Sequence, residues 1–257
     1  MSAGLAFADS GTGPPLVLLH AFPFDRHFWD GVTPLLTDNF RVIAPDLLGF
    51  GDSAATAKWS IEDQGHAVAV LLTSLGLQSA SVLGLSMGGY VALALAANHP
   101  TQIASLILAD TKAAPDTPKA RAGREEAIAL VLSQGVSAFA DGMVAKLLGP
   151  HAHQDVQRST RQLMNQSQHT VVTALKALRD RPDRRPDLPA ITAPCLVLGG
   201  TFDTISPPAE GREIAAALPN AKFVEVADAG HLTNLEAPVA FAKIVTEFLR
   251  DRATKRT

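Results

Sequence analysis

The sequence contains a single cysteine, Cys195, among its 257 residues. One cysteine excludes an internal disulfide and a metal cluster built from several cysteines, and we expect its thiol to be buried. Charge is also scarce, because charged residues make up 18% of the chain and the formal net charge is −3. A chain of this composition lacks the basic surface that a polyanion requires, so we expect no nucleic-acid partner.

Long apolar runs are absent as well. No run approaches the roughly 18 apolar residues that a membrane span requires, and residues 1–13 lack the basic and apolar segments of a signal peptide. We therefore expect a cytoplasmic protein with no membrane partner. The hydrophobic fraction of 47% is typical of a globular protein, and either a monomer or a homodimer fits the sequence.

Short apolar runs alternate with helical patterns along residues 1–110. The strand candidates before residue 110 are 5–8, 16–20, 41–44, 79–85 and 103–108. Such alternation predicts an α/β fold with a mostly parallel central sheet and helices on both faces. Residues 111–189 show only helical periodicity, in four segments. We predict an α/β core domain formed by residues 1–110 and 190–257, and a helical lid formed by residues 111–189.

A Gly-x-Ser-x-Gly sequence, with Ser86 at its centre, joins an apolar run to a helix-forming segment. The pentapeptide alone is common, but between a strand and a helix it predicts a sharp turn that exposes the serine hydroxyl. The glycines, Gly84 and Gly88, let neighbouring chain segments pass without meeting a Cβ. Ser86 is therefore the candidate nucleophile.

A serine hydroxyl needs a base to accept its proton and, usually, a carboxylate to orient that base. Functional groups of parallel sheets gather at the carboxyl ends of the strands. Among the eight histidines, His20 and His231 directly follow predicted strands. We favour His231 as the base, because Gly230 permits a tight turn that leans toward Ser86. For His20 two interpretations stay open, hydrogen bonding that supports its own loop and a place in the substrate pocket.

Two aspartates compete for the orienting role, since both follow predicted strands. Asp203 lies in a Gly-rich loop before Pro207, and this loop could reach His231. Asp110 ends the strand after the nucleophile helix, and we expect it to cap the entry to the lid. We favour Asp203 and keep Asp110 as the alternative.

The backbone N–H groups of Phe22 and Met87 are candidates for an oxyanion hole. Such paired donors hold the negative charge of a tetrahedral intermediate. Candidate side chains of the substrate pocket, for which lid packing is the alternative interpretation, are Leu85, Phe139, Met143 and Leu147, beside His20. A basic group would favour a carboxylate-bearing substrate, and the lid candidates for it are Arg121, Arg124, Arg158 and Arg161.

The chain order Ser86, Asp203, His231 is one of the recognised orders of this machinery. With it, the sequence resembles the α/β-hydrolase superfamily, and within it the serine carboxylesterase and 3-oxoadipate enol-lactonase branch. The motifs that carry the resemblance are His20-Ala21-Phe22-Pro23, Gly84-Leu85-Ser86-Met87-Gly88-Gly89, Gly200-Thr201-Phe202-Asp203 and Gly230-His231. The resemblance implies an α/β-hydrolase fold with a helical lid inserted after the sixth strand, although this chain has a short N-terminal edge.

The resemblance also implies acyl transfer to water without a cofactor or a metal. Dehalogenases and epoxide hydrolases of this fold use an aspartate where this chain has Ser86. The leading hypothesis is therefore a carboxylesterase acting on a small-molecule ester or lactone. Alternatives are a lactonase of a dicarboxylate pathway, a cofactor-free perhydrolase in which hydrogen peroxide replaces water, and a non-catalytic ligand receptor on the same fold.

Overall fold

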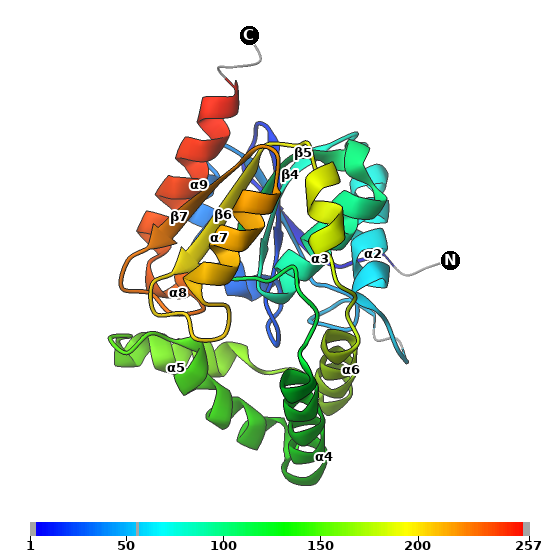
Figure 1. Cartoon of the computed structure of the whole chain (residues 1–257), viewed down its shortest axis with the longest axis vertical. Coiled ribbons are helices and arrows are strands. Elements are labelled where there is room, and N and C mark those ends of the chain that lie inside the picture. The colour runs from blue at the N-terminus through cyan, green and yellow to red at the C-terminus, as the bar shows by residue number, and fades with distance from the viewer. Residues whose placement is uncertain (1–3, 55–56, 254–257) are drawn as a thin grey trace.

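A seven-stranded sheet forms the centre of the computed structural model, which describes residues 4–54 and 57–253 (Figure 1). The strands are β1 (Phe7–Ser10), β2 (Pro15–Leu19), β3 (Arg41–Pro45), β4 (Ala80–Leu85), β5 (Ile103–Ala109), β6 (Cys195–Gly200) and β7 (Ala221–Val226). Their order across the sheet is β1-β3-β2-β4-β5-β6-β7. Only β1 runs antiparallel to its neighbour, which confirms the predicted mostly parallel sheet.

Helices cover both faces of the sheet. The helices outside residues 111–189 are η1 (Arg26–Trp29), α1 (Thr33–Leu36), α2 (Ile61–Ser74), α3 (Met87–Asn98), η2 (Pro100–Gln102), α7 (Pro208–Ala217), α8 (Thr233–Glu236) and α9 (Pro238–Ala253). Apolar residues of α2 and α3 cluster with Val17 and Leu19 of β2, whereas those of α1 and α9 cluster with Leu16 and Leu18. Because each face of β2 is covered, its sequence has no polar alternation.

The insertion between β5 and β6 consists of helices and lies beyond the carboxyl ends of the strands (Figure 1). It contains α4 (Pro118–Leu147), α5 (Gln154–Leu163), α6 (Gln168–Arg179) and η3 (Arg185–Ala190). Non-helical backbone at Gly135, with φ 85°, divides α4 in two, so the four predicted helical segments are present. We refer to residues 111–189 as the lid segment.

The position of the insertion differs by one strand from the expectation. The lid segment follows β5, the fifth strand of the described residues, and not a sixth strand. The reason lies at the N-terminal edge, where β1 alone pairs with the outer side of β3. The expected place after the sixth strand was therefore wrong. The insertion does begin, as predicted, after the strand that follows α3.

By length and hydropathy, α4 is the single described helix that could cross a membrane. The sequence predicted no membrane span, because charged residues interrupt the apolar runs of α4. One such helix is weak evidence of membrane insertion, since the core helix of a soluble protein can pass the same test. The break at Gly135 and the packing of α4 against α6 fit a place within the folded chain.

Candidate active site

Ser86 lies at the turn between β4, the middle strand of the sheet, and α3. Its φ of 54° and ψ of −112° are unfavourable for a residue with a Cβ, and such a conformation persists only where the surroundings enforce it. The Ser86 N–H donates to the Ala109 carbonyl at 2.9 Å, and the Thr111 hydroxyl donates to the Ser86 carbonyl at 2.8 Å. These bonds tie the turn to the end of β5.

Gly84 and Gly88 permit close backbone approaches around this turn. A Cβ on Gly84 would lie 2.1 Å from the carbonyl oxygen of Gly88, and a Cβ on Gly88 would lie 2.0 Å from that of Leu19. Neither neighbour is a movable side chain, so only glycine fits at both positions. The second approach places the start of α3 against the end of β2, and the chain reaches Phe22 shortly after it.

The variant Gly88→Ala is expected to lower the free energy of unfolding by about 1–3 kcal/mol, because its methyl group overpacks against backbone. It also displaces the start of α3 from the loop of Phe22, so kcat should fall. Urea unfolding and ester hydrolysis measure the two effects. Gly123→Ala is the matched control, since a Cβ there meets nothing within 4 Å; equal stability of the two variants would contradict the close approach.

His231 connects Ser86 to Asp203 through its two ring nitrogens. Nε2 lies 2.8 Å from Ser86 Oγ, and Nδ1 lies 2.8 Å from Asp203 Oδ2. Because an ionised carboxylate only accepts hydrogen bonds, Nδ1 carries the proton and Nε2 is free to accept one from the serine hydroxyl. The structure thus brings the three candidate residues, from three separate loops, into one hydrogen-bonded chain.

The surroundings of Asp203 keep its carboxylate ionised. Burial alone would raise its pKa, but the neighbouring His231 and the N–H groups of Ser206 and Ile205 lower the pKa below its usual value. Asp203 Oδ1 accepts those two backbone hydrogen bonds at 2.9 and 2.8 Å. An ionised Asp203 both orients the imidazole and stabilises its cationic form.

Asp110 does not cap the lid segment, and that expectation was wrong. Its carboxyl group is buried, accepts the Gly200 N–H at 2.9 Å and contacts the Thr233 hydroxyl at 2.5 Å. The first lid helix is instead capped by Thr117. Burial and the negative charge of Asp203 raise the pKa of Asp110 well above its usual value, which favours the protonated form of this carboxyl group.

The backbone N–H groups of Phe22 and Met87 are available to act as a pair of hydrogen-bond donors. Met87 is the first residue of α3, where an N–H has no acceptor within the helix. Neither amide donates to another main-chain group in the described part of the chain. The approach of Gly88 to Leu19 holds the two segments side by side. The oxyanion hole stays a prediction, which this arrangement favours.

A family model described as the alpha/beta hydrolase fold matches residues 14–238. The chain belongs to the α/β-hydrolase family. A solved thermophilic esterase from Thermogutta terrifontis is 39% identical, with a TM-score of 0.92 over 96% of this chain and 93% of that one. The enol-lactonase from Burkholderia xenovorans is 30% identical, with a TM-score of 0.87 over 96% of each chain.

A curated relative of this α/β-hydrolase is also an esterase. The pimeloyl-[acyl-carrier protein] methyl ester esterase of Aeromonas hydrophila is 29% identical over 253 residues, which cover 93% of this chain and 96% of that protein. These similarities extend over nearly the whole chain. They confirm that the chain belongs to the predicted superfamily and that esterases and an enol-lactonase are among its relatives.

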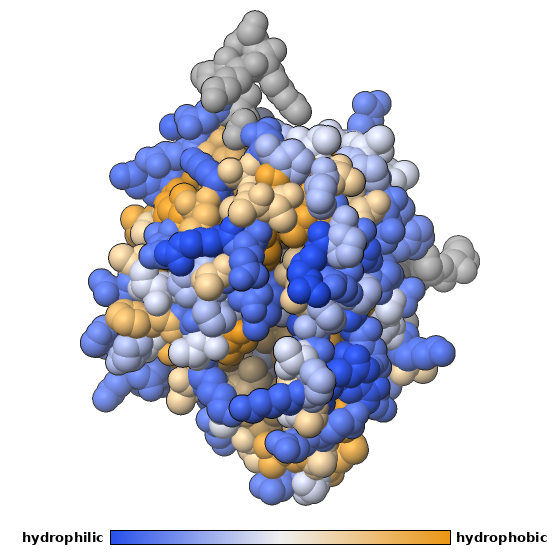
Figure 2. All heavy atoms as spheres, viewed as in Figure 1, coloured by the Kyte–Doolittle hydropathy of each residue, from blue (hydrophilic) through white to orange (hydrophobic). Residues whose placement is uncertain are grey.

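Apolar side chains of the lid segment lie near the candidate site of this α/β-hydrolase. The ring of Phe139 contacts that of Phe22, with centroids 5.9 Å apart, and Met143 packs against the apolar clusters of both faces of the sheet. Leu147 is buried, and its carbonyl accepts the His231 N–H at 2.9 Å. Figure 2 shows apolar surface in a hollow between the lid segment and the rest of the molecule.

Leu85 and His20 occupy core positions. Leu85 is fully buried in the apolar cluster that includes α9. His20 Nε2 accepts the Leu47 N–H at 3.0 Å, and Nδ1 lies 3.0 Å from the Ala21 carbonyl. Burial lowers the pKa of His20, against the opposing effects of the Ala21 carbonyl and of nearby aspartates. A neutral His20 that braces its loop fits these contacts, and the placement argues against a pocket role for either residue.

Four arginines of the lid segment were candidates for binding a substrate carboxylate, and each is paired with an aspartate. The pairs are Arg121 with Asp180 at 3.0 Å, Arg124 with Asp116 at 3.1 Å, Arg158 with Asp155 at 2.7 Å and Arg161 with Asp141 at 2.5 Å. In each pair the aspartate balances the charge of the guanidinium group. None of the four offers a free cation to a substrate carboxylate.

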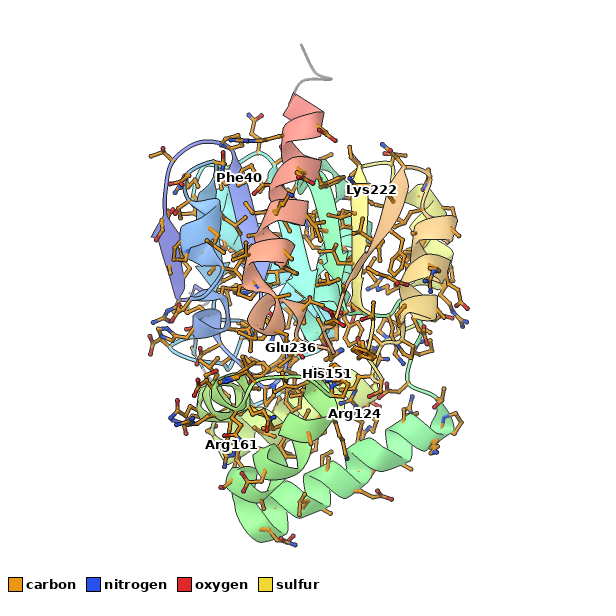
Figure 3. All side chains as sticks on the ribbon, turned by 90° about the vertical axis from the view of Figure 1, so that its left-hand side faces the viewer. Phe40, Arg124, His151, Arg161, Lys222 and Glu236 are labelled. Carbon is orange, nitrogen blue, oxygen red and sulfur yellow. The ribbon has the colours of Figure 1, made fainter. Side chains whose placement is uncertain are left out.

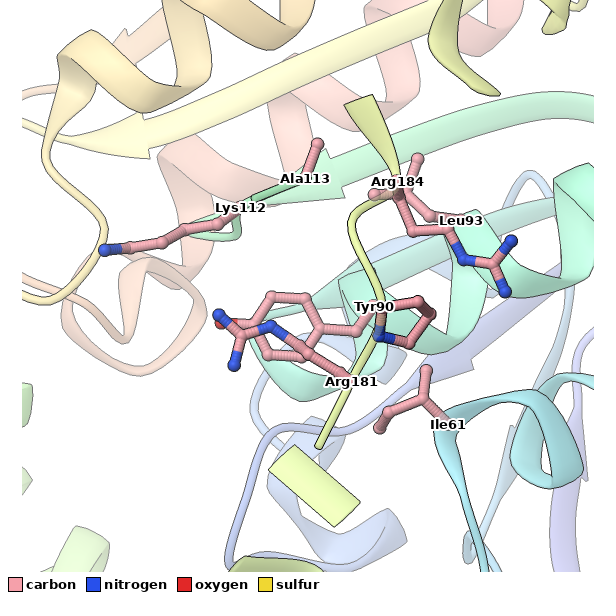
Figure 4. A pocket seen from close by; sticks show the side chains of 8 residues that line it. Ile61, Tyr90, Leu93, Lys112, Ala113, Arg181 and Arg184 are labelled. Atoms are coloured by element: carbon pink, nitrogen blue, oxygen red, sulfur yellow. The ribbon is translucent and has the colours of Figure 1, made fainter. Parts of the chain in front are cut away.

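A small cavity beside α3 is a poor alternative to the site at Ser86. Its volume is about 10 Å³, and the Arg181 guanidinium lies 4.4 Å above the Tyr90 ring at its edge (Figure 4). The residues that line it are Ile61, Tyr90, Leu93, Lys112, Ala113, Arg181, Pro182 and Arg184. A cavity of this size accommodates about one water molecule, which excludes it as an ester site.

Two residues at the site were missed in the sequence. Thr111, two residues after the end of β5, donates a hydrogen bond to the Ser86 carbonyl, and Glu236 contacts the loop of His231. Thr111 directly follows Asp110 near the end of a strand. The rule that functional groups gather at the carboxyl ends of parallel strands could therefore have identified it. No sequence pattern indicates Glu236, because one of its contacts crosses 87 positions of the chain to Gly149.

Proposed function

We propose that this α/β-hydrolase cleaves carboxylic esters of small substrates through an acyl-enzyme on Ser86. The observation that carries the proposal is the position of His231, which lies 2.8 Å from both Ser86 Oγ and Asp203 Oδ2. A serine with a buried, oriented base is the arrangement that nucleophilic acyl transfer needs. Residues 111–189 act as a lid over this centre.

The reaction follows from the tautomer that the hydrogen bonds select. Ser86 Oγ attacks the carbonyl carbon while His231 Nε2 takes its proton, and Asp203 stabilises the resulting imidazolium. The N–H groups of Phe22 and Met87 receive the oxyanion of the tetrahedral intermediate. His231 then returns the proton to the departing alcohol. Water repeats the sequence on the acyl-enzyme and releases the acid.

The preferred acyl group is uncharged. Phe22, Phe139 and Leu147 supply apolar surface at the lid boundary, and the four lid arginines named above are already paired. A dicarboxylate substrate would place its second charge against this surface without a counter-ion, which is costly. These contacts favour a neutral ester over the lactone of a dicarboxylate pathway.

A second candidate is lactone hydrolysis, which the 30% identity to a solved enol-lactonase favours. The same nucleophile and base would open a lactone, because a lactone is a cyclic ester. Its leaving alcohol stays attached to the acyl group. The two functions therefore differ in substrate binding and not in the order of chemical steps.

Parallel assays with p-nitrophenyl butyrate, a neutral γ-lactone and an anionic enol-lactone test the proposal. We expect kcat/KM to be highest for the neutral ester and lowest for the anionic lactone. Arg158→Ala, on the exposed side of α5, is expected to leave this ranking unchanged. Preference for the anionic lactone would contradict the proposed acyl group, and no turnover of any of the three would favour the non-catalytic receptor.

A further inference from the structure

The end of α4 and the loop that carries His231 touch through their backbones. The His231 N–H donates to the Leu147 carbonyl at 2.9 Å. A Cβ on Gly230 would lie 2.4 Å from the Gly149 nitrogen and 2.6 Å from the Leu148 carbonyl carbon. Only a glycine permits this approach. The segment Leu147–Gly149 of the lid thus lies directly against the base of the proposed triad.

One carboxylate holds both sides of this contact. Glu236 Oε2 accepts the Gly149 N–H at 2.7 Å, and Glu236 Oε1 accepts the Gly230 N–H at 2.8 Å. Gly149 belongs to the lid segment, and Gly230 directly precedes His231. Figure 3 shows Glu236 at the boundary between the sheet-bearing part of the chain and the lid segment, near His151.

The charged form of Glu236 suits this position better than an amide would. Burial, with a smaller effect of Asp203, raises its pKa, while the N–H groups of Gly149, Gly230 and Leu232 oppose that rise. Each carboxylate oxygen faces a backbone donor. A glutamine side chain has one accepting oxygen, and its NH₂ group would face an N–H that also donates. Glu236→Gln therefore breaks one side of the contact without changing the size of the side chain.

We propose that Glu236 is a positioning residue that aligns His231 only when residues Leu147–Gly149 of the lid segment are docked against its loop. Glu236 touches neither Ser86 nor the imidazole, so it acts through the Gly230 backbone and couples the lid to the base. This inference rests on the proposed role of His231 as general base.

Steady-state kinetics of Glu236→Gln test the positioning role. We expect kcat to fall about 10- to 100-fold, as for a misaligned catalytic group, with KM changed less than about threefold. Titration with a phosphonate gives the concentration of active sites, so the comparison uses only folded enzyme. Glu247→Gln, at an exposed position of α9, is the matched control. An unchanged kcat per active site would overturn the proposal.

A double-mutant cycle tests the coupling to the lid. A Cβ on Gly149 would lie 3.1 Å from both Glu236 Oε2 and the Gly230 nitrogen, so Gly149→Ala loosens the same contact from the other side. If the two residues act as one link, the double variant loses less in kcat than the product of the two single losses. Losses that multiply independently would overturn the coupling.

Hydrogen–deuterium exchange provides a readout that does not depend on activity. Glu236→Gln is expected to speed exchange both at the segment that contains Gly149 and at the segment that contains Gly230, while α9 keeps its wild-type rate. Faster exchange at one segment alone, or at neither, would contradict the link. If the wild-type chain turns over no ester, the proposed function fails, whereas the exchange result still decides whether Glu236 joins lid and loop.

Discussion

Replacing Ser86 with alanine is expected to lower kcat by roughly 10⁶-fold, as in other enzymes where the serine of such a unit is removed. The variant loses the only atom that forms the acyl-enzyme. The alanine methyl group occupies no more space than the serine side chain, and the contacts of the turn are made by backbone and Thr111. Substrate binding should therefore remain, and the loss should appear in kcat.

Ester hydrolysis under saturating substrate measures this loss, with circular dichroism to show that the variant is folded. His231→Ala should give a similar loss, and the double variant Ser86→Ala with His231→Ala should be no worse than either alone, because the residues act as a unit. Activity of Ser86→Ala within tenfold of wild type, on the order of 1 kcal/mol in barrier height, would show that another group is the nucleophile.

Asp203→Asn is expected to lower kcat by about 10⁴-fold, because an amide favours the wrong imidazole tautomer. The asparagine side chain can donate to Nδ1, and the proton then resides on Nε2, where it blocks proton transfer from Ser86. Two backbone donors, the N–H groups of Ile205 and Ser206, hold the side chain in place. The loss should therefore reflect the tautomer and not an unfolded loop.

Asp110→Asn is the matched comparison, and we expect a loss of at most about 10²-fold, since Asp110 acts only through loop position. Burial and the charge of Asp203 raise its pKa and so favour the protonated form of its carboxyl group, which an uncharged amide of the same size resembles. A larger loss for Asp110→Asn than for Asp203→Asn would reverse the assignment of the acid.

The raised pKa of Asp110 leads to a stability prediction for Asp110→Asn. A folded-state pKa above the usual value means that the folded protein holds a proton that the unfolded chain releases, so this contribution to stability falls as pH rises through that interval. Asp110→Asn removes the titrating group. Its free energy of unfolding should therefore decrease less between acid and neutral pH than that of the wild type, as urea unfolding at several pH values can measure.

Local patterns in the sequence predicted most of the fold. The apolar run of β2 has no polar alternation because helices cover both of its faces. Short apolar runs of the same kind predicted β4, β5 and β6. The turn at Ser86 was predictable because strand, glycines and helix are contiguous. The loops of Asp203 and His231 followed from the rule that functional groups gather at the carboxyl ends of parallel strands.

Contacts between distant segments were harder to predict. Asp110 satisfied the same strand-end rule as Asp203, and only the fold shows that it faces Gly200 and Thr233 and not the lid. The role of Glu236 depends on Gly149, 87 residues earlier in the chain. Hydrophobic periodicity reports which face of an element is buried but not which polar partner it meets.

Covalent labelling of the nucleophile tests the central claim most directly. The folded wild-type chain is treated with a fluorophosphonate, its mass is measured, and the modified peptide is sequenced by tandem mass spectrometry. The account predicts one adduct per chain, located on Ser86, with loss of ester hydrolysis in proportion to labelling and no adduct in Ser86→Ala. A stable wild-type protein that hydrolyses esters yet remains unlabelled at Ser86, or carries the adduct at another residue, would contradict it.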